Sequence, residues 1–414
     1  MPIKKSLHRR AAIAALLAAA AVWLFPAGQS DRGSGIPQEE SALQGQTPAT
    51  GRSSATESKI AEPIVEFSIE DFCDSAAVEE WSKNMLAESG DSMEEFRRMQ
   101  ADTAARLSIS RDPEHLHTAA LLEADLARKV EASTGARAAD PDSSAKHSAK
   151  HSARQIALIS RALDADPGNP LHLWGAVQIC MTASAEWNEK RTECPLEAWQ
   201  ARLLEADPQN REVWAYAAVN LLAAGNESGA LKAMQKAGAL TESRVYWPEA
   251  VEMLERGLAA GTDWPFMGRA TEAIGVAGRN LFNELRPMGL CRDQSEVSQD
   301  WAYACLAYGR QNELNPPIEL ARSPAVAIQQ YALTALGDEE GLAQLNARWR
   351  QQRERRSEIY EEIGSRIVAA VANPTLFARY LQLVRERGEI EAQIAFDREA
   401  QAWVQRHQDA ECIP

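Results

Sequence analysis

Two similar stretches decide the fold of this chain: Arg161-Ala-Leu-Asp-Ala-Asp-Pro167 and, 41 residues later, Ala201-Arg-Leu-Leu-Glu-Ala-Asp-Pro208. In each copy a run of helix-forming residues stops at Asp-Pro, because proline lacks a backbone N–H and cannot continue a helix. A tryptophan follows each proline near the start of the next expected helix, at Trp174 and at Trp214. The pattern predicts a helical unit that is repeated along the chain.

Residues 153–242 resemble the tetratricopeptide repeat (TPR), a pair of antiparallel helices of about 34 residues. In the second copy, small and large residues fall where that family places them: Trp214, Ala218, Leu221, Ala230, Met234 and Ala237. Glu242 stands where a closing proline is usual, and the 41-residue spacing is longer than that of the family. The resemblance implies an α-solenoid, in which successive helix pairs stack on one another.

The composition supports an all-α fold and excludes an all-β protein. Alanine, the best helix former, is abundant, while aromatic residues make up only 6% of the chain. No strand-like alternation of more than a few residues follows the N-terminal segment. The formal net charge of −15 argues against nucleic acid as a partner, because phosphates require a basic surface.

We expect four segments along the chain: a signal peptide or N-terminal membrane anchor at 1–30, a disordered linker at 31–62, a TPR-like helical repeat region at 63–310 and a C-terminal helical region at 311–414. Looser helix pairs are expected at 245–285 and 295–336. The C-terminal region either continues the solenoid or forms a distinct helical bundle.

The first 30 residues have the plan of an export signal, with basic residues followed by fifteen apolar residues from Ala11 to Phe25. A helix of that length spans about 22 Å, which is shorter than the hydrocarbon core of about 30 Å. Both a cleaved signal and a permanent anchor remain open. Either outcome predicts an exported protein of the bacterial periplasm, tethered to the inner membrane or released after cleavage.

The cysteines indicate an oxidising compartment, because an exported chain with an even number of them commonly forms disulfides. The six are Cys73, Cys180, Cys194, Cys291, Cys305 and Cys412. Two pairs have the same separation of 14 residues, Cys180 with Cys194 and Cys291 with Cys305, and these are the candidate bridges. Six cysteines allow fifteen full pairings, so the complete connectivity stays open.

No catalytic, metal or cofactor motif is present among those that we sought. The sequence contains no H-E-x-x-H, G-x-S-x-G, G-x-x-x-x-G-K-[ST] or G-x-G-x-x-G pattern, and no C-x-x-C pair. We therefore expect a non-enzymatic protein with no cofactor. A duplicated Ala-Lys-His-Ser unit places His147 and His151 four residues apart, and we interpret it as an exposed basic stretch rather than a metal site.

The leading hypothesis is a protein–protein interaction scaffold that binds a protein or peptide partner in a groove of the helical repeat. Membrane contact is expected only through the N-terminal segment. The candidate partner-binding residues are Asn210, Glu212, Tyr216 and Asn220 on one helix, with Trp247 and Trp264 beside prolines at element starts. Two alternatives remain: an enzyme that acts on a cell-wall polymer within a helical superhelix, and a structural spacer.

Overall fold

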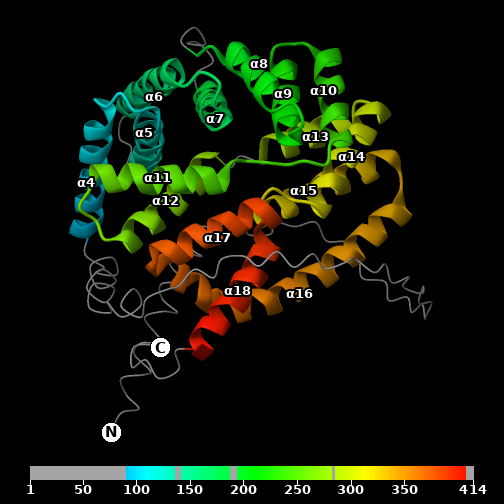
Figure 1. Cartoon of the computed structure of the whole chain (residues 1–414). Helices are drawn as coiled ribbons and strands as arrows, with labels where there is room; N and C mark the ends of the chain where they lie inside the picture. The colour runs from blue at the N-terminus through cyan, green and yellow to red at the C-terminus, as the bar shows by residue number, and fades with distance from the viewer. Residues whose placement is uncertain (1–89, 136–140, 187–193, 282–284, 407–414) are drawn as a thin grey trace.

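The computed structural model describes residues 90–135, 141–186, 194–281 and 285–406, and every regular element in these ranges is a helix (Figure 1). The α-helices are α4 (Gly90–Ser108), α5 (Pro113–Gly135), α6 (Pro141–Ala165), α7 (Pro170–Glu186), α8 (Leu196–Ala206), α9 (Arg211–Ala223), α10 (Glu227–Ala239), α11 (Trp247–Gly261), α12 (Phe266–Leu281), α13 (Leu285–Ser295), α14 (Gln299–Leu314), α15 (Arg322–Leu336), α16 (Glu339–Ala372), α17 (Pro374–Arg387) and α18 (Glu389–Arg406). One short 3-10 helix, η2 (Glu319–Ala321), precedes α15. The all-α expectation is confirmed for these residues, while the expected signal and linker lie outside them.

The repeated Asp-Pro motif forms the same turn twice, between α6 and α7 and between α8 and α9. In the first turn Asn169 donates its amide hydrogen to Asp166, and in the second Asn210 does so to Asp207, with the N···O distance 2.9 Å in both. The amide oxygen of each asparagine then accepts a backbone N–H of the next helix, at 3.0 Å from Leu171 and 3.1 Å from Glu212. Each asparagine therefore ends one turn and caps the following helix.

Small residues bring neighbouring helices close together. Ala218 of α9 and Ala230 of α10 are fully buried within one apolar cluster, as the repeat pattern requires. A Cβ on Gly238 of α10 would lie 2.8 Å from the Cβ of Ala307, and one on Gly309 of α14 would lie 2.9 Å from the carbonyl oxygen of Ala325. Glycine at these two positions permits the close approach of α10 to α14 and of α14 to α15.

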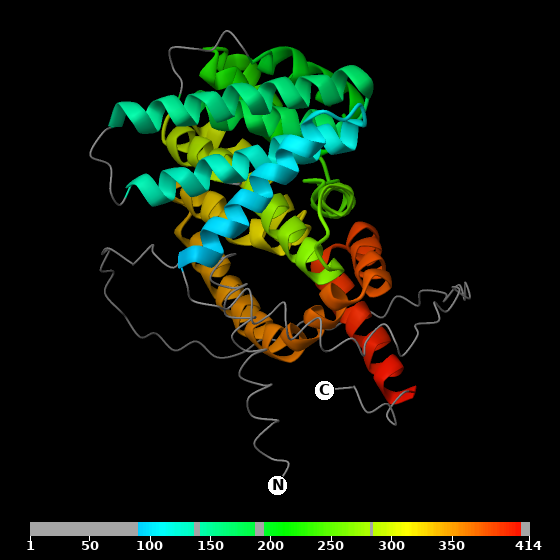
Figure 2. The same ribbon diagram turned by 90° about the vertical axis from the view of Figure 1, so that its left-hand side faces the viewer.

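The order of packing departs from that of a solenoid, in which each unit contacts only its neighbours. Helix α10 packs against α14 rather than α11, while α11 returns to α4, α5 and α17. Figures 1 and 2 both place α8 and α9 at one end of the molecule and α16 and α18 at the other, with α11 between them. The expected solenoid of stacked helix pairs is therefore not confirmed.

The expected boundary between residues 310 and 311 falls inside α14. One apolar cluster contains residues of every helix from α4 through α9, together with α11, α12, α17 and α18. A second contains residues of α9 and α10 together with α13 through α16. Phe266 of α12 and Phe377 of α17 meet edge to face, with ring centroids 5.7 Å apart. Both clusters draw residues from either side of the expected boundary.

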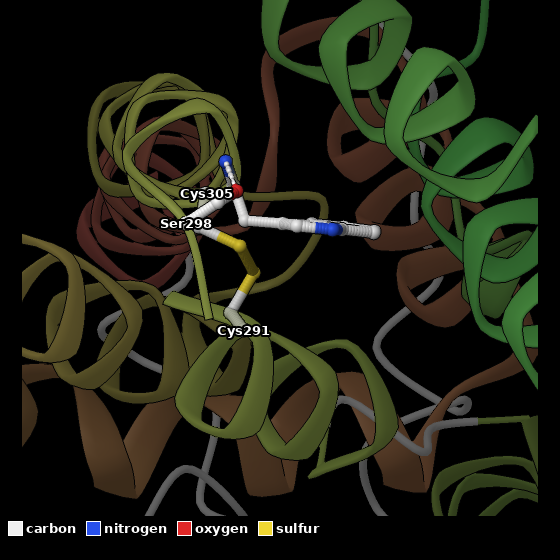
Figure 3. The surroundings of a disulfide bond; sticks show 4 residues. Cys291, Ser298 and Cys305 are labelled. Atoms are coloured by element: carbon white, nitrogen blue, oxygen red, sulfur yellow. Dashed lines mark hydrogen bonds between the residues drawn. A yellow bond between two sulfur atoms is a disulfide. The ribbon is translucent and has the colours of Figure 1, made fainter. Parts of the chain in front are cut away.

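Both candidate disulfides are present in the structure. Cys180 of α7 is bonded to Cys194, just before α8, with Cα atoms 5.9 Å apart, and Cys291 of α13 is bonded to Cys305 of α14, with Cα atoms 5.6 Å apart. Figure 3 shows the second bridge beside Ser298, the residue that caps α14. These bonds are compatible with an oxidising compartment. Cys73 and Cys412 lie outside the described residues.

None of the described helices is both long enough and apolar enough to cross a bilayer.

Candidate functional site

The predicted partner-binding residues of α9 lie against another part of the same chain. Residues 241–246 link α10 to α11 without regular secondary structure, and they pass along the N-terminal end of α9. The backbone N–H of Arg211 donates to the carbonyl oxygen of Glu242 at 3.0 Å. We call the residues 207–212 that hold this link the α9 clamp.

Asn210 uses both ends of its amide to hold the link. Its Nδ2 donates to the carbonyl oxygen of Arg244 at 2.9 Å, and its Oδ1 accepts the backbone N–H of Arg244 at 3.0 Å. The same Oδ1 caps α9, and the side chain is fully buried. The amide group therefore joins the helix and the link as an additional peptide group would.

Arg211 and Glu212 form the charged centre of the α9 clamp, and both are 0% exposed. The Arg211 guanidinium donates to Asn312 Oδ1 at 2.7 Å, to the carbonyl oxygen of Thr241 at 3.0 Å and to the carbonyl oxygen of Asn315. Its Nε lies 3.5 Å from Glu212 Oε1. Three structural elements, namely α9, the 241–246 link and the end of α14, are thus joined through one side chain.

The Glu212 carboxylate is held by hydroxyl groups from two of those elements. Ser243 Oγ donates to Oε1 at 2.9 Å, and the Tyr308 hydroxyl of α14 donates to Oε2 at 2.7 Å. A buried charge is tolerated when it is paired and its oxygens are hydrogen bonded. Both oxygens are therefore engaged within the protein, and neither faces a substrate or partner.

Tyr246 turns the link into α11 in a left-handed conformation, with φ 54°, which is uncommon outside glycine. Its hydroxyl donates to Asp207 in the α9 clamp. Burial, together with this bond to Asp207, raises the pKa of Tyr246 above its ordinary range, so the hydroxyl stays protonated and keeps donating. The conformation and the hydrogen bond together fix where α11 begins.

Tyr216 and Asn220 lie further along α9 and also have internal partners. The Tyr216 ring is 1% exposed and meets Trp174 edge to face, with ring centroids 5.0 Å apart. Asn220 is half-buried and donates to Gln200 Oε1 of α8 at 2.9 Å. The predicted groove-facing set thus packs inside the protein, because α8, α14 and the 241–246 link cover it.

The structure does not bring Trp247 and Trp264 into one site. Trp247 opens α11 and packs against the core, while Trp264 lies half-buried beyond the other end of that helix. The length of α11, about 22 Å at 1.5 Å per residue, lies between them. The two tryptophans therefore stay separate candidate anchors, one at each end of α11.

Among the described residues, no group of three or more histidine, cysteine or acidic side chains is placed to hold a metal ion. His151 of the duplicated motif bonds to Glu123 of α5, with 2.8 Å between Nδ1 and Oε2, and so lies against the protein rather than fully exposed as expected.

Comparison with known proteins finds no significant match to a family model, to a curated protein or to a solved structure. The likeness to TPR proteins therefore rests on the residues quoted above.

Sequence reasoning did not identify Arg211, Ser243 or Tyr308 as members of the buried network. Their hydrogen-bond partners lie 30 to 104 residues away in the chain, so neither motif nor periodicity connects them. One signal was available: an Arg-Glu pair at the start of a helix that is otherwise rich in alanine and valine.

Proposed function

We propose that this chain is a non-enzymatic scaffold of the bacterial cell envelope, exported to the periplasm, which binds a protein or peptide partner on its helical surface. The observation that carries the proposal is that the buried polar side chains of the α9 clamp bond to other parts of the same chain. Arg211, Glu212 and Asn210 hold helices and a link together, whereas a catalytic group must reach a substrate. The basic start and apolar run at 1–30 and the two disulfides support the location.

The partner surface is proposed on the outside of the helices rather than at the α9 clamp. Large apolar side chains are exposed at Ile109, after α4, and at Tyr303, on α14, with exposed fractions of 84% and 59%. Exposed aromatic and aliphatic side chains are common anchors in protein interfaces. Ile109 lies in the turn that follows α4, and Tyr303 lies on α14, so the two positions sample separate segments of the chain.

Site-specific photo-crosslinking in the native envelope tests this function. A photoreactive residue is placed at Ile109, Tyr303 or, as a buried control, Tyr216, in the full-length chain. The proposal expects a discrete adduct with one protein at one exposed position and none at Tyr216. If neither exposed position, nor a subsequent scan of exposed helix positions, yields a discrete adduct, the scaffold proposal fails and the structural spacer is favoured.

An enzyme that acts on a cell-wall polymer remains the second candidate because of Glu389. The pKa of this carboxyl is raised above its ordinary range. Burial is the main cause and the nearby Glu319 carboxylate adds to it, while the hydrogen bond from the Glu319 backbone N–H offsets part of the increase. A raised pKa suits a general acid. Glu389 Oε2 nevertheless accepts the Glu319 backbone N–H at 2.7 Å, a contact that anchors η2 to the start of α18.

A zymogram with cell-wall substrate separates the two candidates. The scaffold proposal expects no lysis band from the full-length chain. A lysis band that is present in the wild type and absent in Glu389→Gln would favour the enzyme and overturn the ranking.

A further inference from the structure

Two buried histidines face each other between α5 and α7. His117 of α5 is 0% exposed and His172 of α7 is 1% exposed. Their Nδ1 atoms are 2.9 Å apart, and the rings meet edge to face at an angle of 73°. A hydrogen bond at this distance requires one Nδ1 to carry a proton and the other to accept it. At least one of the two imidazoles must therefore be neutral.

The remaining ring nitrogens have no hydrogen-bond partner. Both His117 Nε2 and His172 Nε2 are buried and unpaired. The His117 ring lies directly against α7, because a Cβ on Gly175 would be 2.2 Å from its Nε2. Additional charge on either ring would therefore have no group to stabilise it at these atoms.

Acidic groups around the pair raise the pKa of His172, whereas burial lowers the pKa of both rings. Asp112 and Glu114 lie at the start of α5, and Asp166 lies in the turn after α6; all three raise the pKa of His172, but burial lowers it by more. Burial and the neighbouring His172 lower the pKa of His117. On α11, Arg256 is ion paired with Glu114, with 2.9 Å between nitrogen and oxygen, which offsets part of that negative charge.

Other titratable or cationic groups near this end of α5 have partners of their own. His115, two residues before His117, contacts Ser110 Oγ through Nδ1 at 3.1 Å. Arg161 of α6 donates to the carbonyl oxygens of Ser108 and Ser110 at 2.7 and 3.0 Å. His172 also occupies the first turn of α7, where the helix dipole opposes a positive charge.

We propose that the His117–His172 pair is an acid-sensitive latch, which holds α5 against α7 while one imidazole is neutral and opens when both are protonated. The first proton leaves the Nδ1–H···Nδ1 bond in place and adds a buried charge. The second proton makes both Nδ1 atoms donors, so the bond is lost and two positive rings face each other. Acidification would then loosen the joint between the two helices in an exported protein that meets the external pH.

The direction of the pH effect follows from the lowered pKa values of the two rings. In the unfolded chain both histidines have pKa values of about 6.5, so below that pH the unfolded chain binds protons that the folded protein does not. The stability that the neutral histidine pair contributes is therefore fully present above about pH 6.5. It decreases as the pH falls toward the folded-state pKa values. The unfolding equilibrium constant should rise by up to about tenfold per pH unit for each imidazole.

Urea unfolding of the full-length chain between pH 7.5 and pH 5 tests the latch, with His117→Gln as the variant and His115→Gln as the matched control on the same helix. His115→Gln keeps both histidines of the latch, so it should keep the steep loss of stability that the wild type shows as the pH falls. In His117→Gln the unfolding equilibrium constant should rise less steeply than in the wild type as the pH falls, by a factor of up to about tenfold per pH unit. Parallel profiles for the wild type and His117→Gln would overturn the proposal, because these two chains differ only in the His117 imidazole.

A second measurement keeps the test decisive if His117→Gln does not fold. The imidazole resonances of the wild-type protein are followed by NMR as the pH is lowered. The latch predicts a midpoint for His117 below 6.5, accompanied by faster amide exchange in α5 and α7. A midpoint at or above 6.5, or titration without any change in exchange at these helices, would contradict it.

Discussion

At the scale of single residues, the side chain of Arg211 connects distant parts of the described chain, because it joins α9 to Thr241 in the link and to Asn312 in α14. Replacing it by alanine leaves the fully buried carboxylate of Glu212 without its neighbouring positive charge. Breaking a buried ion pair in this way costs about 3–5 kcal/mol. We therefore predict that Arg211→Ala lowers the free energy of unfolding by that amount in urea titrations at neutral pH.

Arg244→Ala is the matched control for this prediction. Arg244 lies in the same link, but its guanidinium is exposed and is 3.5 Å from the exposed carboxylate of Glu242. Its contacts to Asn210 use backbone atoms that alanine retains. We expect a change below about 0.5 kcal/mol. Equal effects of the two substitutions would show that the buried network is not what holds the link.

The residues also show what sequence alone can predict here. The turns at the two Asp-Pro motifs and both disulfides were predictable, because each depends on residues close together in the chain. The position of Asn210, Glu212 and Tyr216 inside the protein was not predictable, because it depends on α14 and on residues 241–246. Local pattern indicates a helix and its caps, but not which distant segment covers it.

At the scale of helices, the two disulfides differ in accessibility. Cys291 and Cys305 are both fully buried, whereas Cys194 is half-buried beside exposed Pro195. Thiol attack requires access to a sulfur atom. We predict that dithiothreitol under native conditions reduces Cys180–Cys194 first, as measured by alkylation and mass spectrometry. Reduction of Cys291–Cys305 at the same or a greater rate would contradict the burial of α13 against α14.

At the scale of the whole molecule, α17 and α12 belong to one core through Phe377 and Phe266. Phe377→Ala should cost about 3–5 kcal/mol, because it empties a buried aromatic site. Hydrogen exchange should then accelerate in α11 and α12 as well as in α17 and α18. Faster exchange confined to residues 374–406 would instead indicate a separate C-terminal bundle.

The α9 clamp holds residues 241–246 and so directs α11 back onto α4 and α5, instead of leaving α9 open as a partner groove. Amide exchange at Arg244 in the full-length wild-type chain tests it most directly. We expect this amide, which donates to buried Asn210, to exchange as slowly as amides inside α9, although it lies in a link without helix. Exchange as fast as that of an unstructured loop would contradict the claim.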